Sequence, residues 1–326
     1  METVQATGGK PGLLVMRKPS EDLLAKLEQR YTLHRLYEAS SKDEMLARVA
    51  PDIHAILTFG GPVDRALMQR LPNLRIVSTW TVGYDAIDVD AASERGIVVT
   101  NTPDVLTDEV ADLTIGLLIA TLREIPRAEA HLRAGKWKSS GPYPVTASLR
   151  GRRVGIVGLG RIGRAIARRL EGFDVPIAYN GRRQQGDVAY TYVADLKALA
   201  EDSDVLIVAT PGGAGTQHLI GADVLKALGP QGVIVNIARG SVIDQAALTT
   251  ALKDGTILAA GLDVFENEPN VPDALIALPN TVLLPHVASA TGPTRYAMES
   301  LAADNLLAFA EGKDLLTPVN DVRPAA

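Results

Sequence analysis

The ten residues "VGIVGLGRIG" (154–163) decide the fold class of this 326-residue chain. Four mostly apolar residues, typical of a buried parallel strand, run into Gly158, Gly160 and Gly163, which have the spacing G-x-G-x-x-G. The helical stretch "RAIARRLEGF" (164–173) follows directly. Glycines at these positions permit a tight turn, a close approach of a diphosphate to the backbone, and close packing of helix on strand. The stretch therefore predicts a strand, turn and helix that hold a dinucleotide.

The next strand, "PIAYN" (176–180), is followed by an unusual group of residues. A unit that binds NAD normally carries an acid here for the ribose hydroxyls, whereas this chain has Gly181, Arg182 and Arg183. Guanidinium groups suit a phosphate, which favours NADP, although arginines are also common on exposed surfaces. A second arginine group is interpreted as one solvated or packing face of the preceding helix: Arg161, Arg164, Arg168 and Arg169.

Composition excludes several classes of function. A net charge of −5 argues against attraction to nucleic acid or to an anionic membrane. The absence of cysteine excludes disulfides, thiolate metal sites and cysteine nucleophiles, and no cluster of residues has the spacing of metal ligands. The longest apolar run, "LTIGLLIATL" (113–122), is too short to span a bilayer, and the first twelve residues lack the apolar core of a signal peptide. A cytoplasmic globular protein is expected.

Strands and helices alternate along the rest of the chain, which is typical of parallel sheets covered by helices on both faces. Hydrophobic patterning predicts strands over residues 12–16, 54–59, 74–80 and 96–101, with helices over 21–31, 64–72 and 88–96. One long helix is predicted over 105–133, and a last helix over 293–313. The fold class is α/β, with two doubly wound parallel-sheet domains.

Three polar residues follow predicted strands in the second half of the chain: Arg239, Glu268 and His286. In open α/β sheets, ligands bind at the carboxyl ends of the strands. Reduction of a 2-oxo acid needs a cation for the carboxylate and an acid for the developing alkoxide, and a carboxylate beside an imidazole keeps it protonated. Each residue alone is more typical of ordinary surface. The remaining histidines are interpreted as solvent-facing or satisfied locally: His34, His54, His131 and His218.

Several long motifs, in order, resemble the D-isomer-specific 2-hydroxyacid dehydrogenases over nearly the whole chain, most of all the NADPH-dependent glyoxylate/hydroxypyruvate reductases. They are "TVGYDAIDVDAASERGIVVTN" (81–101), "TDEVADLTIGLL" (107–118), "LRGRRVGIVGLGRIG" (149–163), "NIARGSVIDQAAL" (236–248), "AAGLDVFENEP" (259–269) and "LLPHVASAT" (283–291). The resemblance implies a Rossmann cofactor domain, residues 103–290, inserted in a flavodoxin-like substrate domain, residues 1–102 and 291–326.

The resemblance also implies roles for single residues. Arg239 binds the substrate, His286 is the acid/base, Glu268 is the partner of the histidine, and Asp263 holds the nicotinamide carboxamide. NAD-linked relatives have their ribose-binding acid where Gly181 stands, so NADPH is expected, with NAD possible at lower efficiency. Formate dehydrogenases have glutamine in place of the acid of the acid–histidine pair, so Glu268 argues against formate.

The wider site is expected by the same likeness. Cofactor contacts are expected at Gly158, Gly160, Arg161, Ile162, Gly163, Gly181, Arg182, Arg183, Thr210, Pro211, Thr216, Ile237, Ala238, Asp263 and His286. Substrate contacts are expected at Arg239 and at Phe59, Gly60, Gly61, Trp80, Val82 and Gly83, whose loops can present backbone amides to a carboxylate. The two aromatic residues of that set could instead be ordinary core.

The partner expected is a small 2-oxo acid, such as glyoxylate or hydroxypyruvate, which NADPH would reduce to a D-2-hydroxy acid. Reduction of aryl 2-oxo acids (hydroxyphenylpyruvate or phenylpyruvate) and an NAD-linked D-2-hydroxyacid dehydrogenase are the alternatives. A dinucleotide-sensing corepressor or scaffold is the alternative without catalysis. No nucleic-acid or membrane partner is expected. A homodimer is expected through the cofactor domain, and Trp137 would reach the neighbouring subunit's cleft, as in some relatives.

Overall fold

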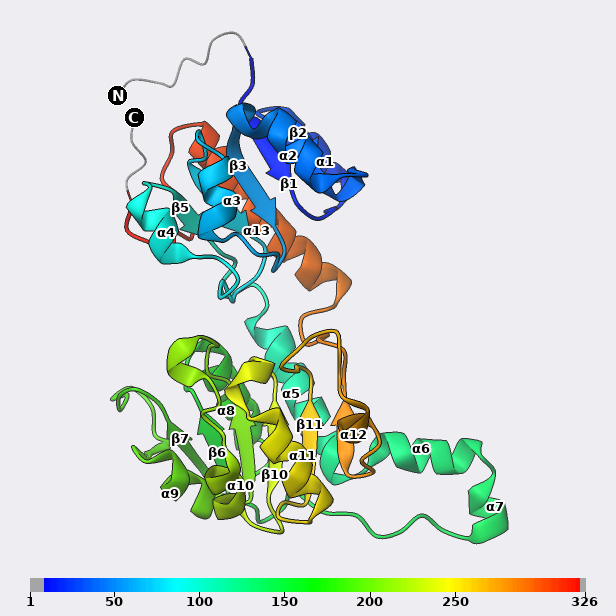
Figure 1. The fold of residues 1–326 in the computed structure, drawn as a ribbon. Coiled ribbons are helices and arrows are strands. Elements are labelled where there is room, and N and C mark those ends of the chain that lie inside the picture. The colour runs from blue at the N-terminus through cyan, green and yellow to red at the C-terminus, as the bar shows by residue number, and fades with distance from the viewer. Residues whose placement is uncertain (1–8, 323–326) are drawn as a thin grey trace. The chain divides into compact units, whose positions relative to one another are not determined.

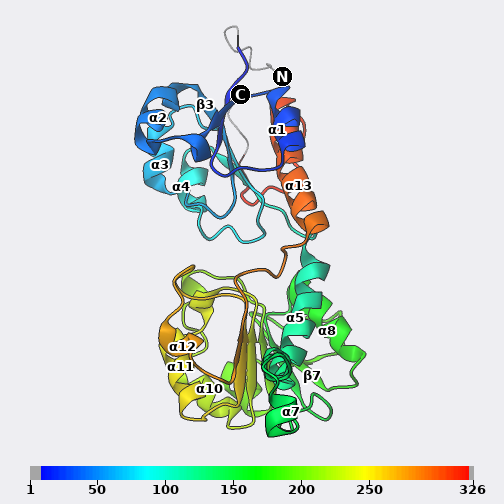
Figure 2. The same ribbon diagram turned by 90° about the vertical axis from the view of Figure 1, so that its right-hand side faces the viewer.

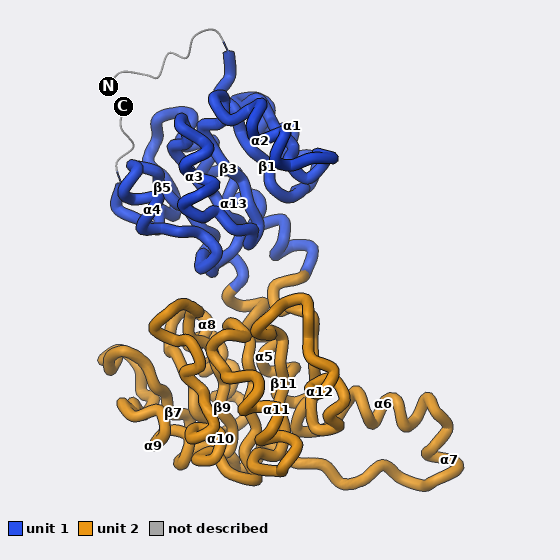
Figure 3. Tube along the Cα trace, viewed as in Figure 1, with its two compact units in different colours: residues 1–106, 291–326 blue, residues 107–290 orange. Residues whose placement is uncertain are grey.

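The structure is a computed structural model that describes residues 9–322. The chain divides into two compact units, one of residues 1–106 with 291–326 and the other of residues 107–290 (Figure 3). The predicted boundary before the cofactor domain fell at residue 102, whereas the first unit extends to Leu106. We call these parts unit 1 and unit 2.

Unit 2 is built on a seven-stranded sheet in which every pair of neighbours is parallel. The strand order β12-β11-β10-β9-β6-β7-β8 starts in the middle, runs outward, and returns to the other side of β6. This is the doubly wound order of dinucleotide-binding sheets, extended by one strand. The strands are β6 (Val154–Val157), β7 (Ile177–Asn180), β8 (Thr191–Tyr192), β9 (Val205–Val208), β10 (Val233–Asn236), β11 (Ala259–Leu262) and β12 (Thr281–Leu283).

Helices cover both faces of this sheet (Figure 2). The helices α5 (Thr107–Leu122) and α8 (Arg161–Glu171) pack against each other on one face, and α10 (Ala222–Leu228) and α11 (Gln245–Lys253) lie on the other. The remaining helices of unit 2 are α6 (Ile125–Arg133), α7 (Lys136–Ser140), α9 (Leu196–Glu201) and α12 (Asp273–Ile276), with short 3-10 turns η3 (Ala214–Thr216) and η4 (Gly240–Val242).

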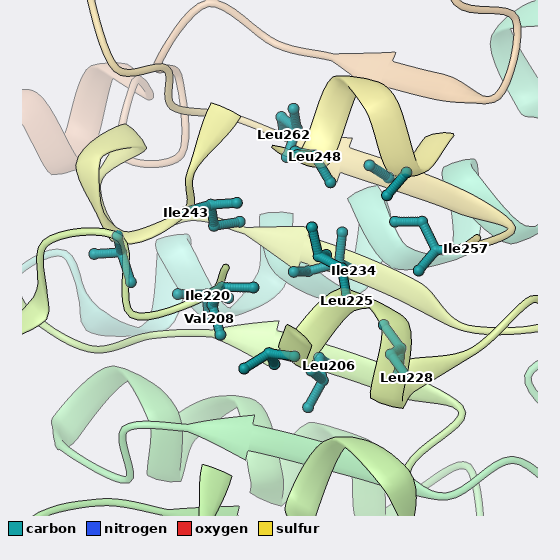
Figure 4. Close-up of a cluster of buried hydrophobic side chains, with 14 of the residues drawn as sticks. Leu206, Val208, Ile220, Leu225, Leu228, Ile234, Ile243, Leu248, Ile257 and Leu262 are labelled. Atoms are coloured by element: carbon teal, nitrogen blue, oxygen red, sulfur yellow. The ribbon is translucent and has the colours of Figure 1, made fainter. Parts of the chain in front are cut away.

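One hydrophobic core cluster of unit 2 lies between the sheet and the α10–α11 layer (Figure 4). Leu206 and Ile234 from the strands meet Leu225 and Leu248 from these two helices. Each such side chain contributes roughly 1.5–3 kcal/mol when it is fully buried. This packing holds the strand ends at fixed positions, and the strand ends carry the candidate site.

Unit 1 has a five-stranded parallel sheet in the order β2-β1-β3-β4-β5, which is the flavodoxin-like order. The strands are β1 (Gly12–Val15), β2 (Thr32–Arg35), β3 (Ile53–Thr58), β4 (Ile76–Thr79) and β5 (Val98–Thr100). The helices are α1 (Glu21–Glu28), α2 (Lys42–Val49), α3 (Arg65–Arg70), α4 (Val89–Glu94) and α13 (Gly292–Ala310), with 3-10 turns η1 (Leu36–Glu38) and η2 (Ala50–Asp52). The last helix, α13, packs on β4 and on α1 (Figure 1), so the end of the chain completes the domain that its beginning started.

The single long helix predicted over residues 105–133 was wrong. Helix α5 ends at Leu122, and α6 begins at Ile125. Glu124 between them has a φ of 49°, a left-handed conformation that ends a helix. Pro126 lies in the first turn of α6, where its missing N–H costs nothing. Within residues 9–322, no helix is both long and apolar enough to cross a membrane.

Candidate active site

Three neighbouring strands of unit 2 end in the residues that carry the candidate chemistry. Arg239 follows β10, Asp263 comes directly after β11, and His286 follows β12. These strands are parallel neighbours, so their carboxyl ends share one edge of the sheet. Ligands of open α/β sheets bind at this edge.

His286 and Glu268 form a hydrogen-bonded pair at this edge. The Nδ1 atom of His286 lies 2.7 Å from Oε2 of Glu268, and the other carboxylate oxygen accepts the backbone N–H of Phe265 at 3.0 Å. Burial alone would raise the pKa of Glu268. The hydrogen bonds from His286 and Phe265, with the charges of His286 and Arg239, outweigh it and hold the pKa below its ordinary value. The carboxylate therefore stays ionised and orients the imidazole, which leaves Nε2 as the ring atom that can transfer a proton.

Asp263 holds the segment that carries His286. Its carboxylate accepts the backbone N–H groups of Val287 and Ala288 at 2.8 and 2.9 Å, and its carbonyl accepts that of His286 at 2.8 Å. The side chain is fully buried, and burial raises the pKa of Asp263 against these hydrogen bonds. His286 has a φ of 54°, an uncommon conformation for a residue other than glycine, so its position depends on this support. A contact of Asp263 with a carboxamide stays a prediction; its positioning role was not predicted.

Arg239 lies in a turn whose shape depends on Asn236 and Gly240, two residues for which the sequence predicted no role. The buried amide of Asn236 accepts the N–H of Ala238 and donates to the carbonyl of Arg239, both at 3.0 Å. Gly240 comes so close to the neighbouring loop that a Cβ there would lie 1.8 Å from the carbonyl carbon of Phe265. A turn of this closeness needs glycine, and it ties the segment of Arg239 to the loop that carries Glu268.

The glycine-rich turn fits a dinucleotide. Gly158 has a φ of 96°, and a Cβ there would lie 2.8 Å from the backbone N of Thr210; a Cβ on Gly163 would lie 2.1 Å from the carbonyl oxygen of Gly158. These two glycines are required by the packing of turn, strand and helix. Gly160, in contrast, has no atom within 4 Å of its Cβ direction. The open position at the start of α8 leaves room for a diphosphate near the helix N-terminus.

The other predicted cofactor residues of unit 2 gather near the same edge. Thr210 and Pro211 follow β9, and the hydroxyl of Thr216 donates to the carbonyl of Pro211 at 2.7 Å. Ile237 and Ala238 follow β10. The structure thus brings residues from β6, β9 and β10 together around the strand-order reversal of the sheet.

Arg182 and Arg183 are exposed after β7. Within residues 9–322 neither takes part in a hydrogen bond or an ion pair. Gly181 before them has open space around its Cβ direction. The arginines of α8, by contrast, are engaged: Arg169 bonds Asp112 on α5 at 2.6 Å, and Arg164 pairs with Asp187.

In unit 1 the predicted substrate residues follow two adjacent strands. Phe59, Gly60 and Gly61 come after β3, and Trp80, Val82 and Gly83 come after β4. The rings of Phe59 and Trp80 stack with centroids 5.5 Å apart, and the guanidinium groups of Arg17 and Arg295 each lie 4.8 Å from the Phe59 centroid. Trp80 is buried at 3% exposure and serves the core, whereas Phe59 is half-buried.

Most of the remaining histidines have local partners. His54 bonds the carbonyl of Asp52, His131 bonds that of Gly141, and His218 contacts Glu266. His34 differs, since its Nε2 is buried without a hydrogen-bond partner among the residues described. Across residues 9–322, no three His, Cys, Asp or Glu side chains are grouped so that they could hold a metal ion.

Two surface hollows are lined by none of these site residues. A hollow of about 590 Å³ lies in unit 1 beside β2, η1 and α2, and one of about 340 Å³ lies in unit 2 between the end of α5 and the amino ends of β10–β12. The second hollow is at the opposite edge of the sheet from His286. The candidate site is therefore assigned from its convergent polar groups.

An all-parallel sheet of this order, with a glycine-rich turn and a histidine–carboxylate pair at its carboxyl edge, is typical of nicotinamide-dependent dehydrogenases. The family model "D-isomer specific 2-hydroxyacid dehydrogenase, NAD binding domain" matches residues 115–288. The chain belongs to this family of D-isomer-specific 2-hydroxyacid dehydrogenases.

Relatives match over nearly their whole length. Hydroxyphenylpyruvate reductase of Plectranthus scutellarioides and glyoxylate/hydroxypyruvate reductase A of Arabidopsis thaliana are each 46% identical over 309 residues, which is 94% of this chain and 98% of the relative. The crystal structure of an NADPH-dependent glyoxylate/hydroxypyruvate reductase of Sinorhizobium meliloti, in complex with NADP and malonate, is 49% identical. It superposes with a TM-score of 0.90 over 98% of this chain and 100% of that chain.

Proposed function

We propose that this protein reduces small 2-oxo acids, with glyoxylate and hydroxypyruvate as the leading substrates, to D-2-hydroxy acids with NADPH. The observation that carries the proposal is the 2.7 Å hydrogen bond between Glu268 and His286, at the same sheet edge as Arg239. Family membership and the reductase relatives support it.

NADPH, when bound, supplies the hydride that adds to the 2-oxo carbon. Arg239 binds the carboxylate and polarises the carbonyl with its planar donors. His286 gives a proton from Nε2 to the oxygen as its negative charge develops, so the hydride forms the new C–H bond and the proton forms the O–H bond of the 2-hydroxy acid. Glu268 stabilises the protonated imidazole and fixes its orientation.

The choice of NADPH rests on the residues after β7. Gly181 replaces an acid that would bind ribose hydroxyls and repel a phosphate. Arg182 and Arg183 are exposed, and both have donors available for a phosphate group. The S. meliloti relative is an NADPH-dependent reductase, which supports the choice of NADPH. NAD remains usable at lower efficiency.

In this proposal unit 2 holds the dinucleotide and the acid–histidine pair. The loops after β3 and β4 of unit 1 carry the backbone amides of Gly60, Gly61, Val82 and Gly83, which are groups of the kind that bind a carboxylate. Gly60 has a φ of 62°, the conformation that lets successive amides converge on an anion.

The alternative within this activity is reduction of aryl 2-oxo acids instead of small ones. A hydroxyphenylpyruvate reductase is as similar to this chain as a glyoxylate/hydroxypyruvate reductase is, and the half-buried Phe59 could stack on an aryl group. The deciding experiment measures kcat/KM for glyoxylate, hydroxypyruvate, phenylpyruvate and hydroxyphenylpyruvate with NADPH and with NADH. The proposal expects the two small acids with NADPH to lead. Preference for the aryl acids would indicate an aryl 2-oxo acid reductase, and preference for NADH would indicate an NAD-linked dehydrogenase. A protein that binds the dinucleotide but turns over none of these acids would be a sensor.

A homodimer is part of the proposal. Helices α6 and α7 project from the rest of unit 2 (Figure 1) and contain no buried residue. Large apolar side chains are exposed on and beside them: Ile125, Leu132, Trp137 and Val145. A second copy would cover these side chains, and Trp137, at 64% exposure, would reach the partner's cleft. Light scattering should give twice the 34.6 kDa chain mass; a monomer at micromolar concentration contradicts this part.

A further inference from the structure

The loop after β7 contains one acidic residue that could oppose a phosphate. Between residues 181 and 190, Asp187 is the only acid, six positions after Gly181. Arg164, in the second turn of α8, holds this carboxylate with two bonds: Nη1 to Oδ2 at 2.7 Å and Nη2 to Oδ1 at 2.8 Å. The pair with Arg164 holds the pKa of Asp187 below its ordinary value, so the carboxylate is ionised and its charge is matched by one guanidinium.

The loop has anchors besides the Arg164–Asp187 pair, and Arg164 takes part in one of them, because its Nη2 also donates to the side-chain oxygen of Gln185. The backbone N–H of Gln185 donates to the hydroxyl of the buried Tyr179 at 2.7 Å, and its amide donates to the carbonyl of Leu159, inside the glycine-rich turn, at 2.8 Å. Tyr192 donates to the carbonyl of Gly181 at 3.1 Å, and Tyr190 to Glu171 at 2.6 Å. Loss of Arg164 would free the charge of Asp187 and remove one bond of Gln185, while the backbone bond to Tyr179 and the bond from Tyr192 would still hold the loop to the sheet.

We propose that Arg164 is a positioning residue for cofactor choice: by holding Asp187 in a two-bond pair, it masks the one carboxylate of the loop that would repel a ribose phosphate. This inference rests on the proposed preference for NADPH. A phosphate monoester carries a charge near −2 at neutral pH, so an unpaired carboxylate in the same loop would oppose it. Arg182 and Arg183 then act on the phosphate without competition from Asp187.

The test compares the binding of 2′,5′-ADP and 5′-AMP, which differ only in the 2′-phosphate, to the full-length protein by calorimetry. The variants are Arg164→Ala, Asp187→Asn and the two combined. Arg168→Ala, on the same helix but directed to Asp108 at 3.8 Å, is the matched control. Thermal unfolding of each variant reports whether it folds.

Arg164→Ala should weaken the binding of 2′,5′-ADP by about twofold to fivefold, within the range of an exposed charge interaction, and should leave the binding of 5′-AMP nearly unchanged. Asp187→Asn should keep the full preference for 2′,5′-ADP over 5′-AMP. The combined variant should recover the preference that Arg164→Ala loses. The effect of Arg164→Ala should shrink as salt rises, because exposed charges are screened beyond about 8 Å at 0.15 M salt. A purely structural role of Arg164 would not show this salt dependence.

Three results would overturn the inference. They are an equal loss of affinity for both nucleotides in Arg164→Ala, a loss of the preference for 2′,5′-ADP in Asp187→Asn, and a combined variant that binds 2′,5′-ADP as weakly as Arg164→Ala does. If Arg164→Ala does not fold, Asp187→Asn still decides, because masking requires that it keep the preference. An unmodified protein that binds both nucleotides equally would refute the NADPH proposal itself. A preference that depends on Arg182 and Arg183 but not on Arg164 would refute this inference alone.

Discussion

Glu268 accepts the Nδ1 hydrogen bond of His286 at 2.7 Å with one carboxylate oxygen, and the backbone N–H of Phe265 with the other. The carboxylate therefore links the imidazole to the loop that carries it. Because Gly240 packs on the same loop, the positions of Arg239, Glu268 and His286 depend on one another.

Glu268→Gln should lower kcat for hydroxypyruvate by about fivefold to tenfold, since a charge-assisted hydrogen bond of about 1.5–3 kcal/mol becomes a neutral one of about 0.5–1.5 kcal/mol. The folded pKa of Glu268 lies below its ordinary value of 4.5. Its stabilising contribution is therefore complete above that value and is lost as pH falls through the lowered pKa. The free energy of unfolding of the unmodified protein should exceed that of Glu268→Gln by a constant amount above about pH 5, and the two values should converge in acid. A gap that grows as pH falls would contradict the assignment.

Arg239→Ala should raise KM for glyoxylate and also lower kcat, because the guanidinium is assigned to both the carboxylate and the polarised carbonyl. Each lost bond to a charged group corresponds to about 1.5–3 kcal/mol, so kcat/KM should fall by at least about tenfold. Arg239→Lys keeps the charge without the planar pair of donors and should recover only part of the loss. Unchanged kcat with a raised KM would restrict Arg239 to binding.

Gly240→Ala should destabilise unit 2 by about 1–3 kcal/mol, the usual cost of overpacking, because the new Cβ would lie 1.8 Å from the carbonyl carbon of Phe265. The loop with Glu268 must then shift, so kcat should fall as well. Gly215→Ala is the matched control, since no atom lies within 4 Å of its Cβ direction. Calorimetry and kcat measured on both variants check this. Equal behaviour of the two would show that the close contact does not position the loop.

Gly181→Asp should shift cofactor preference toward NADH, because the new carboxylate would bind ribose hydroxyls and repel the phosphate. Arg182→Ala with Arg183→Ala should erode the preference for NADPH by about tenfold to a hundredfold, the worth of one charge-assisted bond. Gly181→Ala has open space for its Cβ and controls for loss of glycine alone. Ratios of kcat/KM for the two cofactors decide. Unaltered ratios in both charge variants would remove these residues from the phosphate site.

The local pattern was sufficient where neighbours in sequence are also neighbours in space. The strand, turn and helix of residues 154–171 were predicted because the glycines, the apolar run and the amphipathic helix are adjacent. The long helix over 105–133 failed because apolar periodicity continues past Glu124 although its backbone turns left-handed there. Strand β2 and helix α2 were not predicted, since the edge strand "TLHR" (32–35) has little apolar content.

Some residues of the candidate site could be predicted from the sequence, and others only from the fold. Arg239, Glu268 and His286 could be found because each follows an apolar strand and the family motifs name them. The roles of Asp263 and Gly240 could not, because their partners lie more than twenty residues away and only the folded sheet brings them together. Gln185, whose amide reaches Leu159 in the glycine-rich turn, belongs to the same group.

We propose that His286, held by Glu268, protonates the oxygen of a 2-oxo acid as the acid is reduced. The most direct measurement is kcat for hydroxypyruvate with NADPH in the unmodified protein and in His286→Ala, together with the Kd of NADPH for both. We expect kcat to fall on the order of a hundredfold or more, the contribution of a general acid, while the Kd of NADPH changes little. Near-unmodified turnover in His286→Ala, with NADPH still bound, would contradict it.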